Sequence, residues 1–150
     1  MIVQFSLSSH FRRPVVNLIH GGDTYPSLID TGANIPVFTL GERKLAGFNA
    51  RFVRKGVAFG GFGGDCSGDL YRIDLDFGAF RYVDLPIICT HDPTMPFAFI
   101  LSATMFTGFA YTIDDAARTL TVDTHTDETD LRFRIHDGAG GFRVLVGVKG

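Results

Sequence analysis

Residues 26–33 read PSLIDTGA, and they are the part of the sequence that says most about the fold. They place Asp30 directly after an apolar run, in a turn that a hydroxyl residue and a glycine complete. By chance, a chain of this composition holds roughly 0.14 Asp-Thr-Gly tripeptides, and roughly 0.03 with two apolar residues in front. The stretch therefore indicates a held carboxylate at the end of a buried strand, and it needs support from elsewhere in the chain.

The composition favours one β-rich domain. The chain has 150 residues, enough to bury roughly 68–70% of the surface that its unfolded form exposes. It contains 18 Gly and 15 Phe, and its acidic residues are Asp except for Glu42 and Glu128. Asp favours turns and strand ends over helix interiors, and no apolar period of 3.6 residues is sustained. These features predict an all-β fold.

Charge and cysteine content exclude several classes of partner. The net charge of −2 gives no electrostatic reason to expect nucleic acid or an anionic membrane surface. Cys66 and Cys89 fit a reducing compartment better than a disulfide framework. Residues 1–5 lack the features of a signal peptide, and no apolar stretch reaches membrane-spanning length. The expectation is a cytoplasmic protein. No histidine or cysteine spacing suggests a metal site, so no metal or cofactor is expected.

Alternating and β-branched runs predict the strands, with glycine-centred turns between many of them. The expected strands are Val3–Ser8, Pro14–His20, Thr24–Asp30, Val37–Leu40, Arg51–Gly60, Asp69–Asp76, Arg81–Leu85, Leu85–Cys89, Phe97–Leu101, Tyr111–Asp114, Thr119–Asp123, Leu131–Ile135 and Phe142–Val148. One helical turn is expected over Glu42–Ala46, and Ser102–Thr107 is the best candidate for a short helix.

Three features occur in order along the chain: the turn at Asp30, a tip of four glycines and one phenylalanine over Gly60–Gly64, and the apolar segment Ala98–Leu101 followed by Ser102. Together they resemble the retropepsins, the single-domain aspartic peptidases of retroviral type. The resemblance covers about Val3 to Asp123. It implies a retropepsin-like acid-protease barrel with a glycine-tipped flap hairpin and one short helix, assembled as a homodimer.

The resemblance departs from the family pattern after the third feature. Ser102 stands where the family has glycine, and Ala103-Thr104 stands where it has Arg-Asp or Arg-Asn. That arginine supports the dimer in the family, so the interface here would be held differently. Arg12-Arg13 is either a solvated pair or, as the resemblance suggests, a minor contributor to the interface.

The chemistry of peptide hydrolysis supplies a reason for the dimer. One carboxylate must take a proton from water while a second acid donates to the carbonyl oxygen, and two close carboxyls share one proton. Only one apolar-apolar-Asp-Thr-Gly stretch is present, so a two-lobed enzyme built from two such halves is excluded. The second carboxylate is therefore expected from Asp30 of another copy, across a twofold axis.

The expected site follows from the resemblance. Asp30 would be catalytic, and the turn that holds it would consist of Thr31, Gly32 and Ala33. Peptide or protein substrate would bind between this turn and the flap. The substrate-contacting residues would be Leu28, Asn34, Gly61, Phe62, Gly63, Ala98 and Ile100.

Two alternatives remain beside this interpretation. Fold does not guarantee activity, so the chain could be an inactive peptide-binding or dimerisation module of the same fold. The glycine tip could also be a phosphate-binding loop, but no Lys-Ser/Thr and no helix signal follow it. Residues 1–123 are expected to form the peptidase domain. Residues 124–150 would add a C-terminal hairpin packed on it, because so short a hairpin is marginal alone.

Overall fold

The computed structural model describes residues 2–8, 12–61, 64–78, 80–106, 110–123, 130–138 and 141–148. These residues are mostly β-sheet with one short α-helix, which confirms the predicted β-rich class. The first strands are β1 (Ile2–Gln4), β2 (Ser6–Leu7), β3 (Pro14–His20), β4 (Asp23–Asp30) and β5 (Val37–Phe38). Helix α1 (Glu42–Leu45) continues into a 3₁₀ turn, η1 (Ala46–Phe48).

The longer strands follow α1 and η1 in the chain. They are β6 (Arg51–Gly61), β7 (Gly64–Phe77) and β8 (Phe80–Cys89), followed by β9 (Phe99–Ser102) and a 3₁₀ turn, η2 (Ala103–Phe106). The last four strands are β10 (Ala110–Asp114), β11 (Thr119–Asp123), β12 (Asp130–Gly138) and β13 (Gly141–Val148). Among the described residues, no helix is long and apolar enough to cross a membrane.

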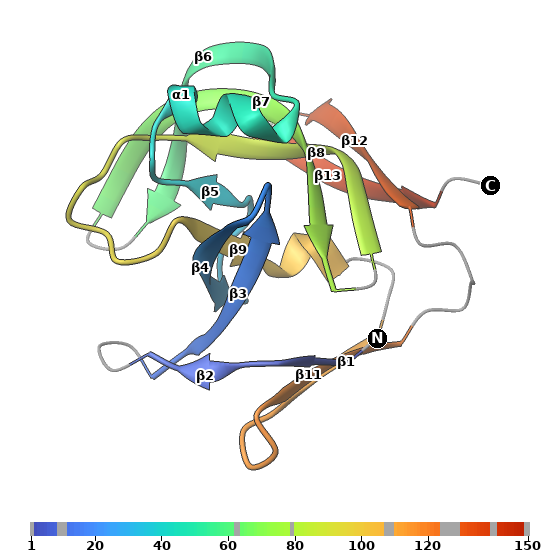
Figure 1. Ribbon diagram of the computed structural model, residues 1–150. Coiled ribbons are helices and arrows are strands. Elements are labelled where there is room, and N and C mark those ends of the chain that lie inside the picture. Colours follow the sequence, from blue (N-terminus) through green and yellow to red (C-terminus); the bar gives the residue numbers. More distant parts are fainter. Residues whose placement is uncertain are drawn as a thin grey trace.

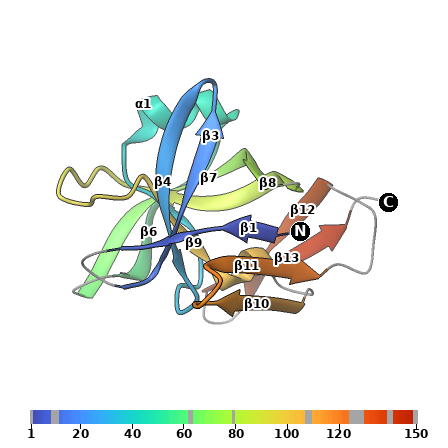
Figure 2. The ribbon, with the colours of Figure 1, turned by 60° about the horizontal axis from the view of Figure 1, so that its bottom comes forward.

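Most strands belong to one ten-stranded sheet. Its main path runs β13-β12-β8-β5-β9-β4-β3-β2, and β7 pairs with β8 while β6 pairs with β7. In Figure 1, α1 and strands β6 to β8 lie at the top of the view, whereas β1, β2 and β11 lie below. Figure 2 shows β3 and β4 running as a pair through the middle.

Strand β4 is held on both edges. It pairs antiparallel with β3 and parallel with β9, so that Asp30 lies in register with Ser102. Leu28 and Ile29 on β4 are 0% and 2% exposed. The strand that ends at Asp30 is therefore fixed by hydrogen bonds on either side and by buried apolar side chains along its length.

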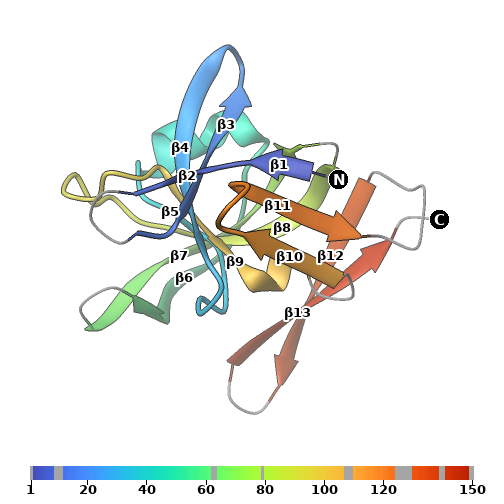
Figure 3. The same ribbon diagram turned by 90° about the horizontal axis from the view of Figure 1, so that it is seen from below.

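A separate three-stranded sheet joins the first described strand to a later hairpin. Its order is β1-β11-β10, with Val3 opposite Leu120, and the three strands lie side by side in Figure 3. The pair β12–β13 reaches the large sheet through β12, whose residue Asp130 lies opposite Arg81 of β8 in parallel register.

The core lies between these strands and the helical turns. At its aromatic centre, Phe38, Phe48 and Phe99 contact one another in edge-to-face and tilted arrangements, with ring centroids 4.8 to 5.9 Å apart. Tyr82 is fully buried, and its hydroxyl donates a hydrogen bond of 3.0 Å to the Met105 carbonyl oxygen. Burial of this ring raises the pKa of Tyr82, so the hydroxyl stays protonated.

One glycine in the sheet has no room for a side chain. Gly68 lies on β7 beside the end of β8, and a Cβ atom there would come within 2.6 Å of the Cys89 carbonyl oxygen. Real Cβ atoms do not approach backbone so closely, so glycine is required for this contact between the strands.

Several predicted boundaries need correction. The strand predicted over Val3–Ser8 is broken into β1 and β2, and the strands predicted on either side of Leu85 form one strand, β8. Ser102 ends β9 instead of starting a helix, and the turn after it is 3₁₀. The predicted loop over Gly60–Gly64 is shorter, because β6 continues to Gly61 and β7 starts at Gly64.

Candidate active site

The turn after β4 holds the Asp30 carboxylate by local contacts. The Gly32 backbone N–H donates a 3.0 Å hydrogen bond to Asp30 Oδ1, and the Ala33 N–H donates one of 3.1 Å to the Asp30 carbonyl oxygen. A Cβ atom at Gly32 would lie 3.4 Å from Asp30 Oδ1. The turn therefore fixes the orientation of one carboxylate oxygen through the backbone.

The other carboxylate oxygen faces an arginine of the same chain. Arg13 Nη1 lies 3.1 Å from Asp30 Oδ2, and the two side chains are 44% and 20% exposed. Arg13 was expected to be solvated or to lie at an interface between copies, and here it pairs with Asp30. Because the pair is open to water, screening keeps its contribution to stability small, at about 1 kcal/mol or less.

Asp30 lines a cleft of about 210 Å³. The turn and the following segment contribute Ala33, Ile35, Val37 and Thr39, every second residue facing the same side. We call β4, its turn and β9 the floor of this cleft, and Ile100 of β9 also lines it. The floor is thus an apolar surface with one carboxylate at its edge.

The β6–β7 hairpin contributes the opposite side, which we call the roof. Phe59 of β6 and Ser67 and Cys66 of β7 line the same cleft as Asp30. Phe59 pairs with Cys66 in the hairpin, so both strands of the roof face the cleft. A bound extended chain would therefore lie between Asp30 and this hairpin.

The segment after β8 closes one wall. Thr90, Asp92 and Met95 line the cleft there. Asp92 is held by Thr94, whose hydroxyl and backbone N–H donate hydrogen bonds of 2.6 and 3.0 Å to Asp92 Oδ1. These bonds, the hydroxyl bond first, lower the pKa of Asp92. A second carboxylate, kept ionised, thus faces the same space as Asp30.

Three of the expected site residues lie together around the cleft: Asp30, Ala33 and Ile100. Thr31 and Gly32 are exposed in the turn, and Gly61 ends β6 at the far end of the roof. Phe62 and Gly63 lie outside the described residues. None of the described side chains forms a group of three or more His, Cys, Asp and Glu that could hold a metal ion.

The other three expected residues do not line the cleft. The side chain of Leu28 is fully buried, so no surface of it is open to the cleft. Asn34 is exposed beside the turn. Ala98 lines a different cavity. We therefore leave Leu28, Asn34 and Ala98 out of the site.

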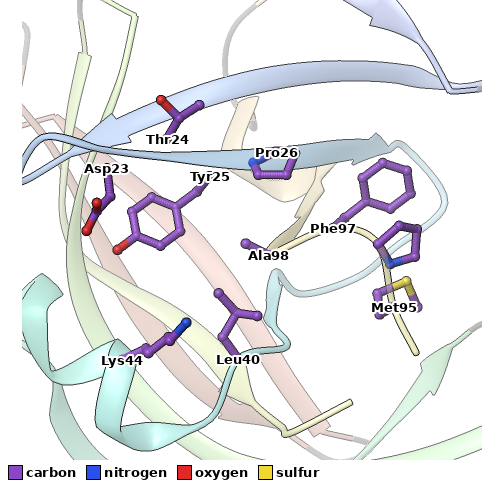
Figure 4. Close-up of a pocket in the computed structure, with 10 residues that line it drawn as sticks. Asp23, Thr24, Tyr25, Pro26, Leu40, Lys44, Met95, Phe97 and Ala98 are labelled. Carbon is purple, nitrogen blue, oxygen red and sulfur yellow. The ribbon is translucent and has the colours of Figure 1, made fainter. Parts of the chain in front are cut away.

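The second cavity, of about 460 Å³, lies beside the N-terminal part of β4. Figure 4 shows Tyr25 and Asp23 of β4 facing Leu40 and Lys44 across it. Met95 lines both cavities. The segment between β8 and β9 thus separates the Asp30 cleft from this second space.

Sequence reasoning missed three groups of lining residues, and one of them is formed by Phe59, Cys66 and Ser67 of the roof. Ile35, Val37 and Thr39 alternate with a period of two directly after the turn, a pattern that marks one face of an extended segment. Thr90, Asp92 and Met95 carry no such signal, because β5 brings them to the cleft by pairing with the end of β8, where Phe38 lies opposite Cys89.

Comparison with known proteins adds a likeness of fold. No family model matches the chain, and no curated protein matches it in sequence. Among solved structures, the chain is similar to the crystal structure of a retropepsin-like aspartic protease from Rickettsia conorii. The TM-score is 0.48 and the identity 12%, and the match covers 81% of this chain and 88% of that chain. Function is therefore inferred from the cleft itself.

Proposed function

We propose that this chain is a retropepsin-like aspartic endopeptidase that works as a homodimer. One observation carries the proposal: the Asp30 carboxylate and both strands of the β6–β7 hairpin line a single cleft. Such a cleft, with an acid on the floor and a hairpin above, suits an extended peptide whose amide bond is attacked by water. Peptide or protein substrate and a second copy are the proposed partners, and no cofactor is needed.

The second carboxylate of the reaction would come from Asp30 of the other copy. Two close carboxyls share one proton, so one can accept a proton from water while the other donates to the substrate carbonyl oxygen. Asp92 is unsuited to donate the proton, because the bonds from Thr94 lower its pKa and favour its ionised form. A twofold axis beside the exposed Thr31 would bring the two turns together.

The turn and the roof would have different tasks in this reaction. Gly32 fixes Asp30 Oδ1 through its N–H, and the missing side chain lets the substrate backbone come near. Gly61, Phe62 and Gly63 would form the tip of a flap that opens for the substrate and closes over it. Ala33 and Ile100 would contact apolar side chains beside the cleaved bond. Residues 1–123 would carry this unit, and 124–150 would extend it.

The test compares cleavage of a peptide library by the unchanged chain and by Asp30→Asn. We expect the variant to lose at least about 10²–10⁴-fold in rate, since it removes an acid–base group. Asp76→Asn is the matched control, because Asp76 is exposed on β7 and does not line the cleft; it should cleave as the unchanged chain does. Sedimentation should show a dimer in the active sample.

Two outcomes would contradict the proposal. Equal cleavage by Asp30→Asn and the unchanged chain would exclude Asp30 as the catalytic acid. Peptide binding or dimerisation without cleavage under any condition would instead favour the inactive module of the same fold. Inhibition by a peptide analogue with a hydroxyl group in place of the scissile bond would support the paired carboxylates, since such groups mimic the attacked intermediate.

A further inference from the structure

The cleft has a second charged group that the proposed reaction does not use. Asp92 lies on its wall, among residues that are otherwise apolar or neutral apart from Asp30. None of the described residues that line the cleft is Lys, Arg or His. Asp30 has the Arg13 guanidinium as its partner, so Asp92 is the carboxylate of the lining that faces the cleft without a described ion pair.

The position of Asp92 is fixed by its neighbours. Its backbone N–H donates a 2.9 Å hydrogen bond to the Thr39 carbonyl oxygen, and the Met95 N–H donates one of 3.2 Å to the Asp92 carbonyl oxygen. The two bonds from Thr94 both end on Oδ1, so Thr94 leaves Oδ2 unengaged. The carboxylate is thus held in place before any ligand arrives.

The surroundings of this carboxylate suit a long cationic side chain. Lys and Arg bury an apolar stem and keep a charged head at a polar group. Met95 offers a flexible apolar surface for such a stem, three residues from Asp92 and on the same cleft. A hydrogen bond between ionised partners is about twice as strong as one between neutral groups.

We propose that Asp92 is a specificity-determining residue, which selects peptides that place a Lys or Arg side chain on this wall of the cleft. This inference rests on the proposed function, because it assumes that a peptide lies between floor and roof. The Asp92 carboxylate would receive the cationic head, while Asp30 acts on the peptide bond. The apolar lining would still favour apolar side chains at the remaining contacts.

Asp92 could serve only to accept the two hydrogen bonds from Thr94, with no role in recognition of a peptide. Two variants separate this structural role from the recognition of a cationic side chain. Asp92→Asn keeps an oxygen that accepts from Thr94 but removes the charge. Asp92→Lys reverses the charge. Asp76→Asn again serves as the control, since it removes a carboxylate away from the cleft.

The experiment uses peptides that carry Lys, norleucine or Glu at each position around the cleaved bond, and it measures kcat/KM. At one position we expect the unchanged chain to prefer Lys over norleucine by about 2–5-fold, the range for an ion pair that is open to water. In Asp92→Asn this ratio should fall toward one, and in Asp92→Lys the Glu peptide should become the better substrate. Asp76→Asn should keep the original ratio.

Binding of the same peptides to the Asp30→Asn chain, followed by fluorescence anisotropy, separates this inference from the proposed function. A preference for Lys that disappears in the Asp30→Asn/Asp92→Asn double variant supports the role of Asp92 even if no peptide is cleaved. Cleavage without a preference for Lys at any position, or a preference that Asp92→Asn leaves intact, overturns the inference while the peptidase assignment stands.

Discussion

The floor and the roof of the cleft are built in different ways. Strand β4 of the floor has a strand on each edge, and Leu28 and Ile29 are 0% and 2% exposed. In the roof, β6 pairs with β7 alone among the described strands, its register shifts twice, and Phe52 is 58% exposed. Pairing on both edges and burial therefore fix the place of the Asp30 carboxylate, whereas β6 of the roof has a described strand on one edge alone, although its Val57 is buried.

The largest effect is expected from Leu28→Ala in the floor. Removing a fully buried leucine should lower the free energy of unfolding by about 2–5 kcal/mol. Urea unfolding measures this change, and activity should fall with the folded fraction. Ile19→Ala is the control, because Ile19 on the neighbouring β3 is 69% exposed. A stable Leu28→Ala chain with an altered cleavage preference would show that Leu28 contacts substrate after all.

A smaller effect, on activity more than on stability, is expected from Phe59→Ala in the roof. Phe59 lines the cleft and is only half-buried, so its loss should remove contact with the substrate. We expect kcat/KM to fall about tenfold, which corresponds to about 1.4 kcal/mol. Phe52→Ala on the same strand should leave kcat/KM nearly unchanged. If Phe59→Ala lowered stability as much as Leu28→Ala, the contrast between floor and roof would be wrong.

The smallest effect concerns the polar base of the roof. Asp74 on β7 accepts hydrogen bonds of 2.9 Å from Asn49 Nδ2, 3.2 Å from Arg51 Nη2 and 3.2 Å from the Asp84 N–H. Desolvation raises the pKa of Asp74, but these bonds together outweigh it and bring the pKa below its ordinary 3.8. The folded state therefore binds the proton less tightly than the unfolded state, and the ionised carboxylate stabilises the fold.

Asp74→Asn should lower the free energy of unfolding by about 1 kcal/mol at neutral pH, since the partner Arg51 is open to water and screening weakens the ion pair. Because the folded pKa is lowered, this contribution is present above the unfolded pKa and is lost as the pH falls through the folded value. Urea unfolding of both chains at pH 7 and near pH 3 measures the difference, which should shrink in acid. A stability difference that grew in acid would contradict a lowered pKa of Asp74 in the folded chain.

The floor was easier to predict from the sequence than the roof. The strand predicted over Pro14–His20 has the bounds of β3. The strand predicted over Thr24–Asp30 ends where β4 ends, but β4 starts one residue earlier, at Asp23. Burial alternates along β3, where Val16 and Leu18 are buried on either side of the exposed Asn17, whereas β4 is marked by its apolar run before Asp30. At Gly60 and Gly61 the sequence predicts a loop, yet the ladder with β7 continues, since backbone hydrogen bonds need no side chain.

Only the site residues that belong to a local sequence motif could be predicted. Asp30 and Ala33 follow from the turn, and Ile100 from the apolar segment of β9. Asp92 and Met95 come to the cleft through pairing between strands that are distant in the sequence, which no local pattern records. Leu28 was assigned to the site by resemblance, but its side chain is fully buried.

The contact at Gly68 gives a way to recognise relatives that keep this architecture after the rest of the sequence has diverged. A chain that retains the approach of β7 to the Cys89 carbonyl is expected to have glycine at the aligned position, because even alanine would meet the backbone at 2.6 Å. This marker is independent of the Asp-Thr-Gly turn. A chain with the turn and a larger residue at position 68 must have moved β7, and with it the cover of the cleft.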